Sequence, residues 1–151
     1  MIKVFLIVNS SGKIRIRRFY DEVEFARQQQ IEQKLIQLTS KLSPNSCNFF
    51  KDLDGIYDKK CKIVMRFFGT LYFIAVIDED ESELGVLDLI QNIVDLMDKI
   101  FENACELDVL YHPDKMNALI DEIIVAGIVV ETNIMDIQEA LKQQETQIKN
   151  K

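Results

Sequence analysis

The most constraining feature of this sequence is a pair of short segments that are apolar on both faces of a strand. Residues 71–77 read Leu-Tyr-Phe-Ile-Ala-Val-Ile, and residues 2–8 carry apolar side chains at even and odd positions alike. A strand points successive side chains to opposite faces, so a strand that is apolar on both faces is covered on both sides. The two segments therefore predict central strands of a sheet with both faces buried.

Turn residues separate the other segments and determine how the strands connect. Asn9-Ser10-Ser11-Gly12 and Gly69-Thr70 are short enough to join neighbouring strands as hairpins, so the sheet is expected to be antiparallel. Asp21 is expected to cap a helix, with Glu24 in capping-box spacing. Helical periodicity returns after residues 78–83. The expected order is ββαβββααα. Strands are expected at 2–8, 14–20, 47–50, 61–68 and 71–77. Helices are expected after Asp21, at 86–101, from Pro113 to Gly127 and from Thr132 or Asn133, with a connector at 106–111.

Length, charge and cysteine usage disfavour several classes of function. The 151 residues fit one domain, and a net charge of −7 argues against general nucleic-acid binding. Three isolated cysteines without a Cys-x-x-Cys pair are typical of a reducing compartment. No apolar run approaches the ~20 residues that a membrane span needs. Positive charge is nevertheless concentrated in the first hairpin, at Lys3, Lys13, Arg15, Arg17 and Arg18.

The sequence contains no recognisable constellation of catalytic residues. The only histidine, His112, stands beside Pro113 at an expected helix start, with no nucleophile arranged next to it. Residues 78–83 begin like a calcium loop, but Glu83 stands where glycine is needed and Leu89 where glutamate is needed. A glycine-rich phosphate loop is also missing. We therefore expect a protein that is not an enzyme and holds no cofactor or metal.

Three stretches resemble the small (sigma) subunits of clathrin-adaptor-type coat complexes. Residues 1–20 open with Met-Ile-Lys and continue through Gly12-Lys13 and Arg15 to Phe19-Tyr20. Residues 66–73, Arg-Phe-Phe-Gly-Thr-Leu-Tyr-Phe, are similar to the family's Arg-x-Tyr-Ala-x-Leu-Tyr-Phe. Residues 101–108, Phe-Glu-Asn-Ala-Cys-Glu-Leu-Asp, are similar to its Phe-x-x-Val-Cys-Glu-Leu-Asp. The resemblance covers roughly residues 1–141, and residues 47–49 and 81–91 look most like the sigma subunit of adaptor complex 3.

The resemblance implies a fold, partners and a cellular role. The implied fold is a longin-like mixed α/β (α+β) domain over residues 1–142, a five-stranded antiparallel sheet between helices, with a polar tail at 143–151. Such a chain would join large adaptin subunits and a medium (mu) subunit in a heterotetramer, and would help recognise acidic dileucine signals in membrane cargo. It would serve vesicle-mediated transport in the cytoplasm, at the cytosolic face of Golgi or endosomal vesicles, and would touch the membrane only through the complex.

The resemblance also implies a binding site for the signal peptide. Its leucine side chains would enter an apolar slot, where Asn103 would supply a polar contact. Arg15, on a strand face shared with Arg17, would meet the acidic residue of the signal. Gly69 and Ala104 are smaller than the family's usual residues, so the slot is expected to be roomier. The slot maps onto Gly69, Leu71, Val94, Ala104, Leu107 and Val109.

Two other interpretations remain open at this point. A coatomer zeta subunit would be a coat scaffold that does not bind cargo peptides, and an enzyme or GTPase-regulating longin module would belong to a different class. The peptide slot tests the first alternative, and copurification with large adaptin chains tests the second. The 86–101 helix is apolar around most of its circumference, so we also expect a large adaptin chain to cover it over more than about 2,000 Å².

Overall fold

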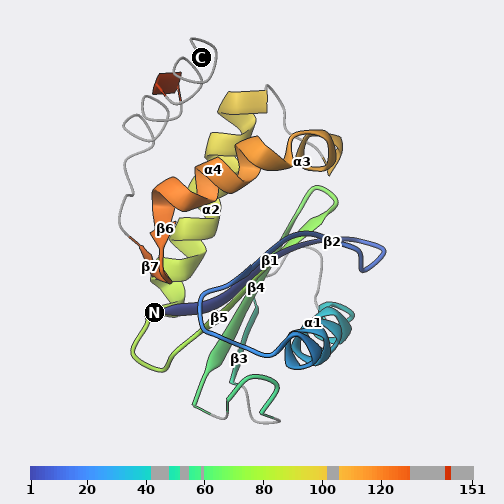
Figure 1. Cartoon of the computed structure of the whole chain (residues 1–151), viewed down its shortest axis with the longest axis vertical. Helices are drawn as coiled ribbons and strands as arrows, with labels where there is room; N and C mark the ends of the chain where they lie inside the picture. Colours follow the sequence, from blue (N-terminus) through green and yellow to red (C-terminus); the bar gives the residue numbers. More distant parts are fainter. Residues whose placement is uncertain (42–47, 52–54, 59, 102–105, 130–141, 144–151) are drawn as a thin grey trace.

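The two doubly apolar segments form neighbouring strands at the centre of a five-stranded sheet. The structure is a computed structural model that describes residues 1–41, 48–51, 55–58, 60–101, 106–129 and 142–143 (Figure 1). β1 (Ile2–Asn9) pairs with β5 (Leu71–Ile77), and all neighbours run antiparallel in the order β2-β1-β5-β4-β3. The expected central strands are thereby confirmed. The remaining strands are β2 (Ile14–Phe19), β3 (Asn48–Lys51) and β4 (Lys62–Phe68).

Helices cover both faces of this sheet, which confirms the expected mixed fold. α1 (Phe25–Thr39) lies against one face, and α2 (Glu83–Phe101) and α4 (Pro113–Ile123) lie against the other (Figure 1). The short helix α3 (Glu106–Tyr111) lies beside α4, near the tip of the β4–β5 hairpin. The sheet is therefore the middle layer of three, as the two-sided apolar pattern of its central strands requires.

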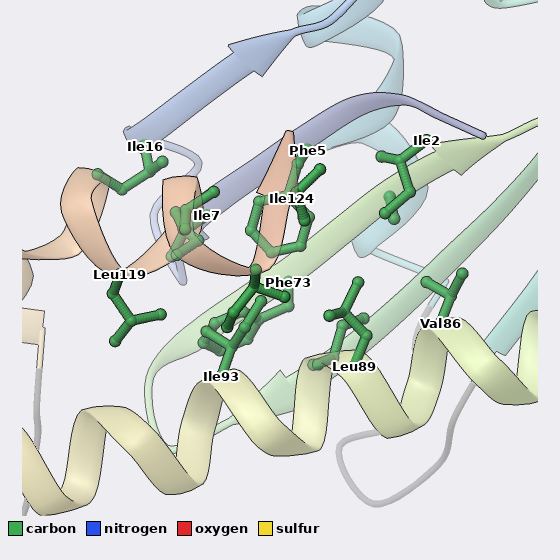
Figure 2. Packing of buried hydrophobic residues seen from close by; sticks show 14 of the residues in the cluster. Ile2, Phe5, Ile7, Ile16, Phe73, Val86, Leu89, Ile93, Leu119 and Ile124 are labelled. Carbon is green, nitrogen blue, oxygen red and sulfur yellow. The ribbon is translucent and has the colours of Figure 1, made fainter. Parts of the chain in front are cut away.

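Two separate apolar clusters hold the layers together. On the side of α2, Phe5 and Ile7 of β1 and Phe73 of β5 point toward Leu89 and Ile93 (Figure 2). Full burial of one such side chain is worth about 1.5–3 kcal/mol, so each layer contributes strongly to stability. The cluster on the side of α1 contains Val4, Leu6, Val8, Ile31, Leu35, Ile63, Met65, Ile74 and Val76.

The expected helix from Pro113 to Gly127 ends early. α4 stops at Ile123, and the chain continues as a hairpin of β6 (Ile124–Val125) and β7 (Ile128–Val129). Its two turn residues, Ala126 and Gly127, both have positive φ (51° and 82°), as a type I′ turn requires. β-Branched residues on both sides of the turn favour strand over helix, and the Ile2 N–H donates to the Gly127 carbonyl at 2.7 Å.

Two further expectations about helices were wrong. α1 begins at Phe25 after Glu24, which makes no side-chain capping bond. Asp21 does not cap the helix, because it accepts a hydrogen bond from the Tyr57 hydroxyl and pairs with Lys3 Nζ at 3.3 Å. The 106–111 connector is the helix α3, which is too short for its periodicity to be visible in the sequence. The helix expected from Thr132 or Asn133 lies outside the described residues.

The apolar circumference of α2 is covered by this chain itself. Its buried residues lie in the cluster between the sheet and α4, and Leu84 is the one large apolar side chain of α2 that is strongly exposed, at 69%. The premise that a face of this helix is left for a partner was therefore wrong. Large apolar side chains are instead exposed on α3 and on the β6–β7 hairpin, namely Leu107, Leu110, Tyr111, Val125 and Ile128.

Candidate functional site

A pocket of about 300 Å³ opens between the tip of the β4–β5 hairpin, α2 and the first residue of α3. This volume is at the lower end of the roughly 300–1,000 Å³ that is typical of ligand pockets. Figure 1 shows the hairpin tip reaching toward α3. The apolar wall comes from two strands and one helix, because Phe68, Leu71, Phe73, Val94 and Met97 line it.

The hairpin turn determines the shape of this wall. Gly69 and Thr70 connect Phe68 to Leu71 in a two-residue turn, and Gly69 has a φ of +59°, as at the first position of a type II′ turn. A Cβ on Gly69 would have no neighbour within 4 Å, so the pocket is open here. The Phe68 and Phe73 rings meet edge to face with centroids 6.1 Å apart, a favourable geometry for an aromatic pair.

A carboxylate at the rim receives three hydrogen bonds on a single oxygen. Glu106 Oε1 accepts from Arg15 Nε at 3.1 Å, from Arg15 Nη2 at 2.9 Å and from Asn9 Nδ2 at 2.8 Å. Asn9 is itself fixed, since its Oδ1 accepts the backbone N–H groups of Ser11 and Lys13 at 3.0 and 2.8 Å. Hydrogen bonds from Asn9 and then Arg15 hold the pKa of Glu106 below its ordinary value of 4.5. The carboxylate is therefore ionised at neutral pH.

A β-bulge directs Arg15 toward this rim. Ile14 pairs with Val8 and Ile16 pairs with Ile7, so Arg15 is an extra residue without a partner on β1. Such a bulge turns the side chain of the extra residue away from the regular alternation. Arg15 consequently pairs with Glu106 on the α3 side of the sheet, while Arg17 pairs with Glu32 of α1 at 2.6 Å. The expectation that Arg15 and Arg17 share a strand face was therefore wrong.

Internal ion pairs neutralise most of the positive charge of the first hairpin. Besides the pairs of Arg15 and Arg17, Lys3 pairs with Asp21 and Arg18 with Asp121. Lys13 is exposed and forms no ion pair with another described residue. The hairpin is thus much less cationic in the folded chain than its sequence suggests.

The structure brings some of the predicted site residues together and separates others. Gly69, Leu71 and Val94 line one pocket, and Arg15 reaches its rim through Glu106. Val109 is 1% exposed and belongs to the core, and Leu107 is 56% exposed. Neither Leu107 nor Val109 lines the pocket. Asn103 and Ala104 lie outside the described residues.

Sequence reasoning missed several residues of the pocket. The turn residue Thr70 and the rim carboxylates Asp98 and Glu106 also line it. Glu106 lies in the stretch Cys-Glu-Leu-Asp that carried the resemblance, and its place in that stretch was the available signal. Phe68, Phe73 and Met97 gave no signal of their own, because buried aromatic and methionine side chains look like ordinary core in a sequence.

Neither a cluster of metal-binding side chains nor a membrane-spanning helix occurs among the described residues. No three His, Cys, Asp or Glu side chains among them are placed to hold a metal ion. Within the same part of the chain, no helix has both the length and the apolar character needed to cross a membrane.

This chain is similar to adaptor small chains along nearly its whole length. The family model for the clathrin adaptor complex small chain matches residues 1–148. The AP-3 complex subunit sigma of Dictyostelium discoideum is 46% identical, over 88% of this chain and 79% of that protein. The AP-3 complex subunit sigma-2 of Homo sapiens is 41% identical, over 95% and 75%. The AP-3 complex subunit sigma of Arabidopsis thaliana is 35% identical, over 95% and 86%.

A structural comparison agrees with the sequence comparison. One chain of a homology model of the full-length AP-3 complex in a stretched open conformation aligns with a TM-score of 0.73 at 26% identity, over 99% of this chain and 96% of that chain. The antiparallel sheet between helices is thus the longin-like fold of adaptor small chains. This chain belongs to the family of clathrin adaptor complex small chains, and within that family it is similar to the AP-3 sigma subunits.

Proposed function

We propose that this chain is the small subunit of an AP-3 adaptor complex and that its pocket contributes to binding acidic dileucine signals in cargo tails. The names of its relatives support membership in that complex. The observation that carries signal recognition is the apolar pocket at the β4–β5 turn with Arg15 at its rim. In this role the chain is a binding subunit and not an enzyme.

The chemistry of the signal matches the pocket. An acidic-x-x-x-Leu-Leu or Leu-Ile signal presents two branched aliphatic side chains and one carboxylate. Leu71, Val94 and Met97 offer an apolar surface for the aliphatic side chains, and the β4–β5 turn leaves open space beside them. Arg15 provides a guanidinium for the carboxylate. Burying each leucine is worth about 1.5–3 kcal/mol, so most of the affinity would come from the slot.

The proposal is tested by Val94→Asp in the assembled complex. This change places a carboxylate in the apolar wall and should lower the affinity for a dileucine peptide at least about tenfold, the loss of one buried leucine. Fluorescence anisotropy with a labelled peptide measures the affinity. Leu84→Asp is the matched control, because Leu84 is 69% exposed on the same helix, α2, and does not line the pocket.

Three results separate the proposal from its alternatives. Val94→Asp should weaken binding of the dileucine peptide, and Leu84→Asp should not. A peptide with both leucines replaced by alanine should bind only weakly to the wild-type complex and to both variants. If the wild-type complex binds the dileucine and the alanine peptides equally weakly, a coat scaffold of the coatomer zeta kind becomes the better description. Gel filtration shows whether each variant still assembles.

The partners follow from the same proposal. Large adaptin subunits and a medium (mu) subunit would complete a heterotetramer, and a partner chain would cover the exposed apolar side chains on α3 and the β6–β7 hairpin. The proposed location is the cytosolic face of Golgi and endosomal transport vesicles, with membrane contact made through the complex. Affinity purification of the tagged chain from its source cells should recover large adaptin chains. Recovery of the chain without them would count against the assembly.

A further inference from the structure

In this structure, the arginine at the rim of the pocket is already bound to a carboxylate of its own chain. Arg15 directs both Nε and Nη2 at Glu106 Oε1, so the edge of the guanidinium that usually grips a carboxylate is occupied. Glu106 itself lines the pocket. An incoming carboxylate would thus meet an anion in the position that it needs.

The surroundings hold this pair in place from both sides. Arg15 is the extra residue of the β-bulge, and its side chain is only 20% exposed. Glu106 receives a further hydrogen bond from Asn9, which the β1–β2 turn fixes. Lys13 lies close enough to favour the charged form of Glu106 as well. The pair is therefore a built contact between β2 and α3 and not a chance encounter of two solvated side chains.

We propose that Glu106 is an internal competitor for the acidic residue of the signal, and that it sets how strongly the pocket depends on that residue. The inference rests on the proposed function. A peptide carboxylate can approach Arg15 only by displacing Glu106 or by sharing one guanidinium with it, and two carboxylates on one guanidinium repel each other. Glu106 therefore lowers the affinity for acidic signals while leaving the leucine slot unchanged. As a result, contact between Arg15 and an acidic residue is not enough by itself to retain a peptide.

The test is Glu106→Gln in the assembled complex, measured with two peptides. One peptide is an acidic dileucine signal, and the other has glutamine in place of the acidic residue. Glutamine keeps the shape of Glu106 but removes its charge, so its hold on Arg15 is weaker and an incoming carboxylate displaces it more easily. Affinity for the acidic peptide should rise by about two- to fivefold, the usual range for a partly exposed ion pair, and affinity for the glutamine peptide should stay the same.

Two further variants show whether the gain is specific. Arg15→Ser combined with Glu106→Gln removes both partners and leaves no unpaired charge, and the gain for the acidic peptide should vanish in it. Asp121→Asn is the matched control, because Asp121 pairs with Arg18 of the same strand at 2.7 Å but does not line the pocket. It should leave both affinities unchanged.

The outcomes distinguish this inference from the proposed function. If wild type prefers the acidic peptide and Glu106→Gln reduces or does not change that preference, Glu106 only positions Arg15, and the competitor role is wrong while the site stands. If the gain persists without Arg15, the effect is general charge repulsion and the competitor role is again wrong. If wild type binds neither peptide, the proposed function fails, and this inference fails with it.

Discussion

Replacing Gly127 by alanine should destabilise the chain more than the same change at Gly69. Both glycines have positive φ, +82° and +59°, and such a backbone costs alanine about 1–2 kcal/mol. Only Gly127 is also in close contact with another strand, since a Cβ there would lie 2.3 Å from the carbonyl oxygen of Ile2 and 3.1 Å from two atoms of Met1. At Gly69 a Cβ has no neighbour within 4 Å.

The difference between the two variants isolates the cost of this close contact. The Ile2 oxygen belongs to the backbone, so relief requires β1 or the β6–β7 turn to move, and such overpacking costs about 1–3 kcal/mol. The total is about 2–5 kcal/mol for Gly127→Ala against about 1–2 kcal/mol for Gly69→Ala. In a chain of this length each kcal/mol lowers Tm by about 2–4 °C.

Thermal unfolding of the two variants, followed by circular dichroism, measures this difference. The Tm of Gly127→Ala should lie at least about 2–4 °C below that of Gly69→Ala. Hydrogen exchange at the Ile2 amide gives a local readout, because this amide donates to the Gly127 carbonyl at 2.7 Å. Its protection should fall in Gly127→Ala only. Equal Tm values, together with an Ile2 amide that stays protected, would refute the view that the hairpin is docked on β1.

Two further predictions concern the buried hydroxyl of Tyr20 and the titrating carboxyl of Glu106. The Tyr20 hydroxyl is buried without a hydrogen-bond partner among the described residues, and burial raises the pKa of Tyr20 to about 12. Tyr20→Phe should therefore leave the free energy of unfolding unchanged or raise it by up to about 1 kcal/mol in a urea titration, and a clear loss would reveal a partner for the hydroxyl. The lowered pKa of Glu106 makes a contribution to stability that is complete above its ordinary value of 4.5 and is lost as the pH falls through the lowered pKa. The urea midpoint of unfolding should consequently fall less steeply with decreasing pH for Glu106→Gln than for wild type. Parallel curves would show that the pairing of Glu106 does not contribute to stability.

The layered fold could be predicted because burial leaves a periodic trace in the sequence. β1 and β5 are apolar on both faces, and this pattern alone indicates central strands. The hairpin after α4 could not be predicted in the same way. The apolar run of the helix continues through Ile123, Ile124 and Val125, so its pattern does not mark the end of α4. The chain leaves the helix because the Gly127 carbonyl accepts a hydrogen bond from Ile2 of β1, a tertiary contact that the local pattern does not record.

The candidate site was predicted less completely, for geometric reasons. Leu107 and Val109 were both assigned to the slot, but residues two apart on a helix point in different directions, and α3 turns Val109 inward and Leu107 outward. Gly69 and Leu71, which were also assigned to the slot, both line the pocket, because a tight turn leaves few alternatives for their positions. The pairing of Arg15 with Glu106 depends on a bulge whose single extra residue has no distinctive sequence.

The bulge at Arg15 lets one short strand neutralise acids on opposite sides of the sheet. In an unbroken ladder, Arg15 and Arg17 would point the same way, because their positions have the same parity. One of two carboxylates would then lose its cation: Glu32, which is buried on α1, or Glu106 at the rim. A charge left alone in a buried position is far more costly than one in water. The irregular residue thus allows a single hairpin to serve both the interior beneath α1 and the pocket on the other face.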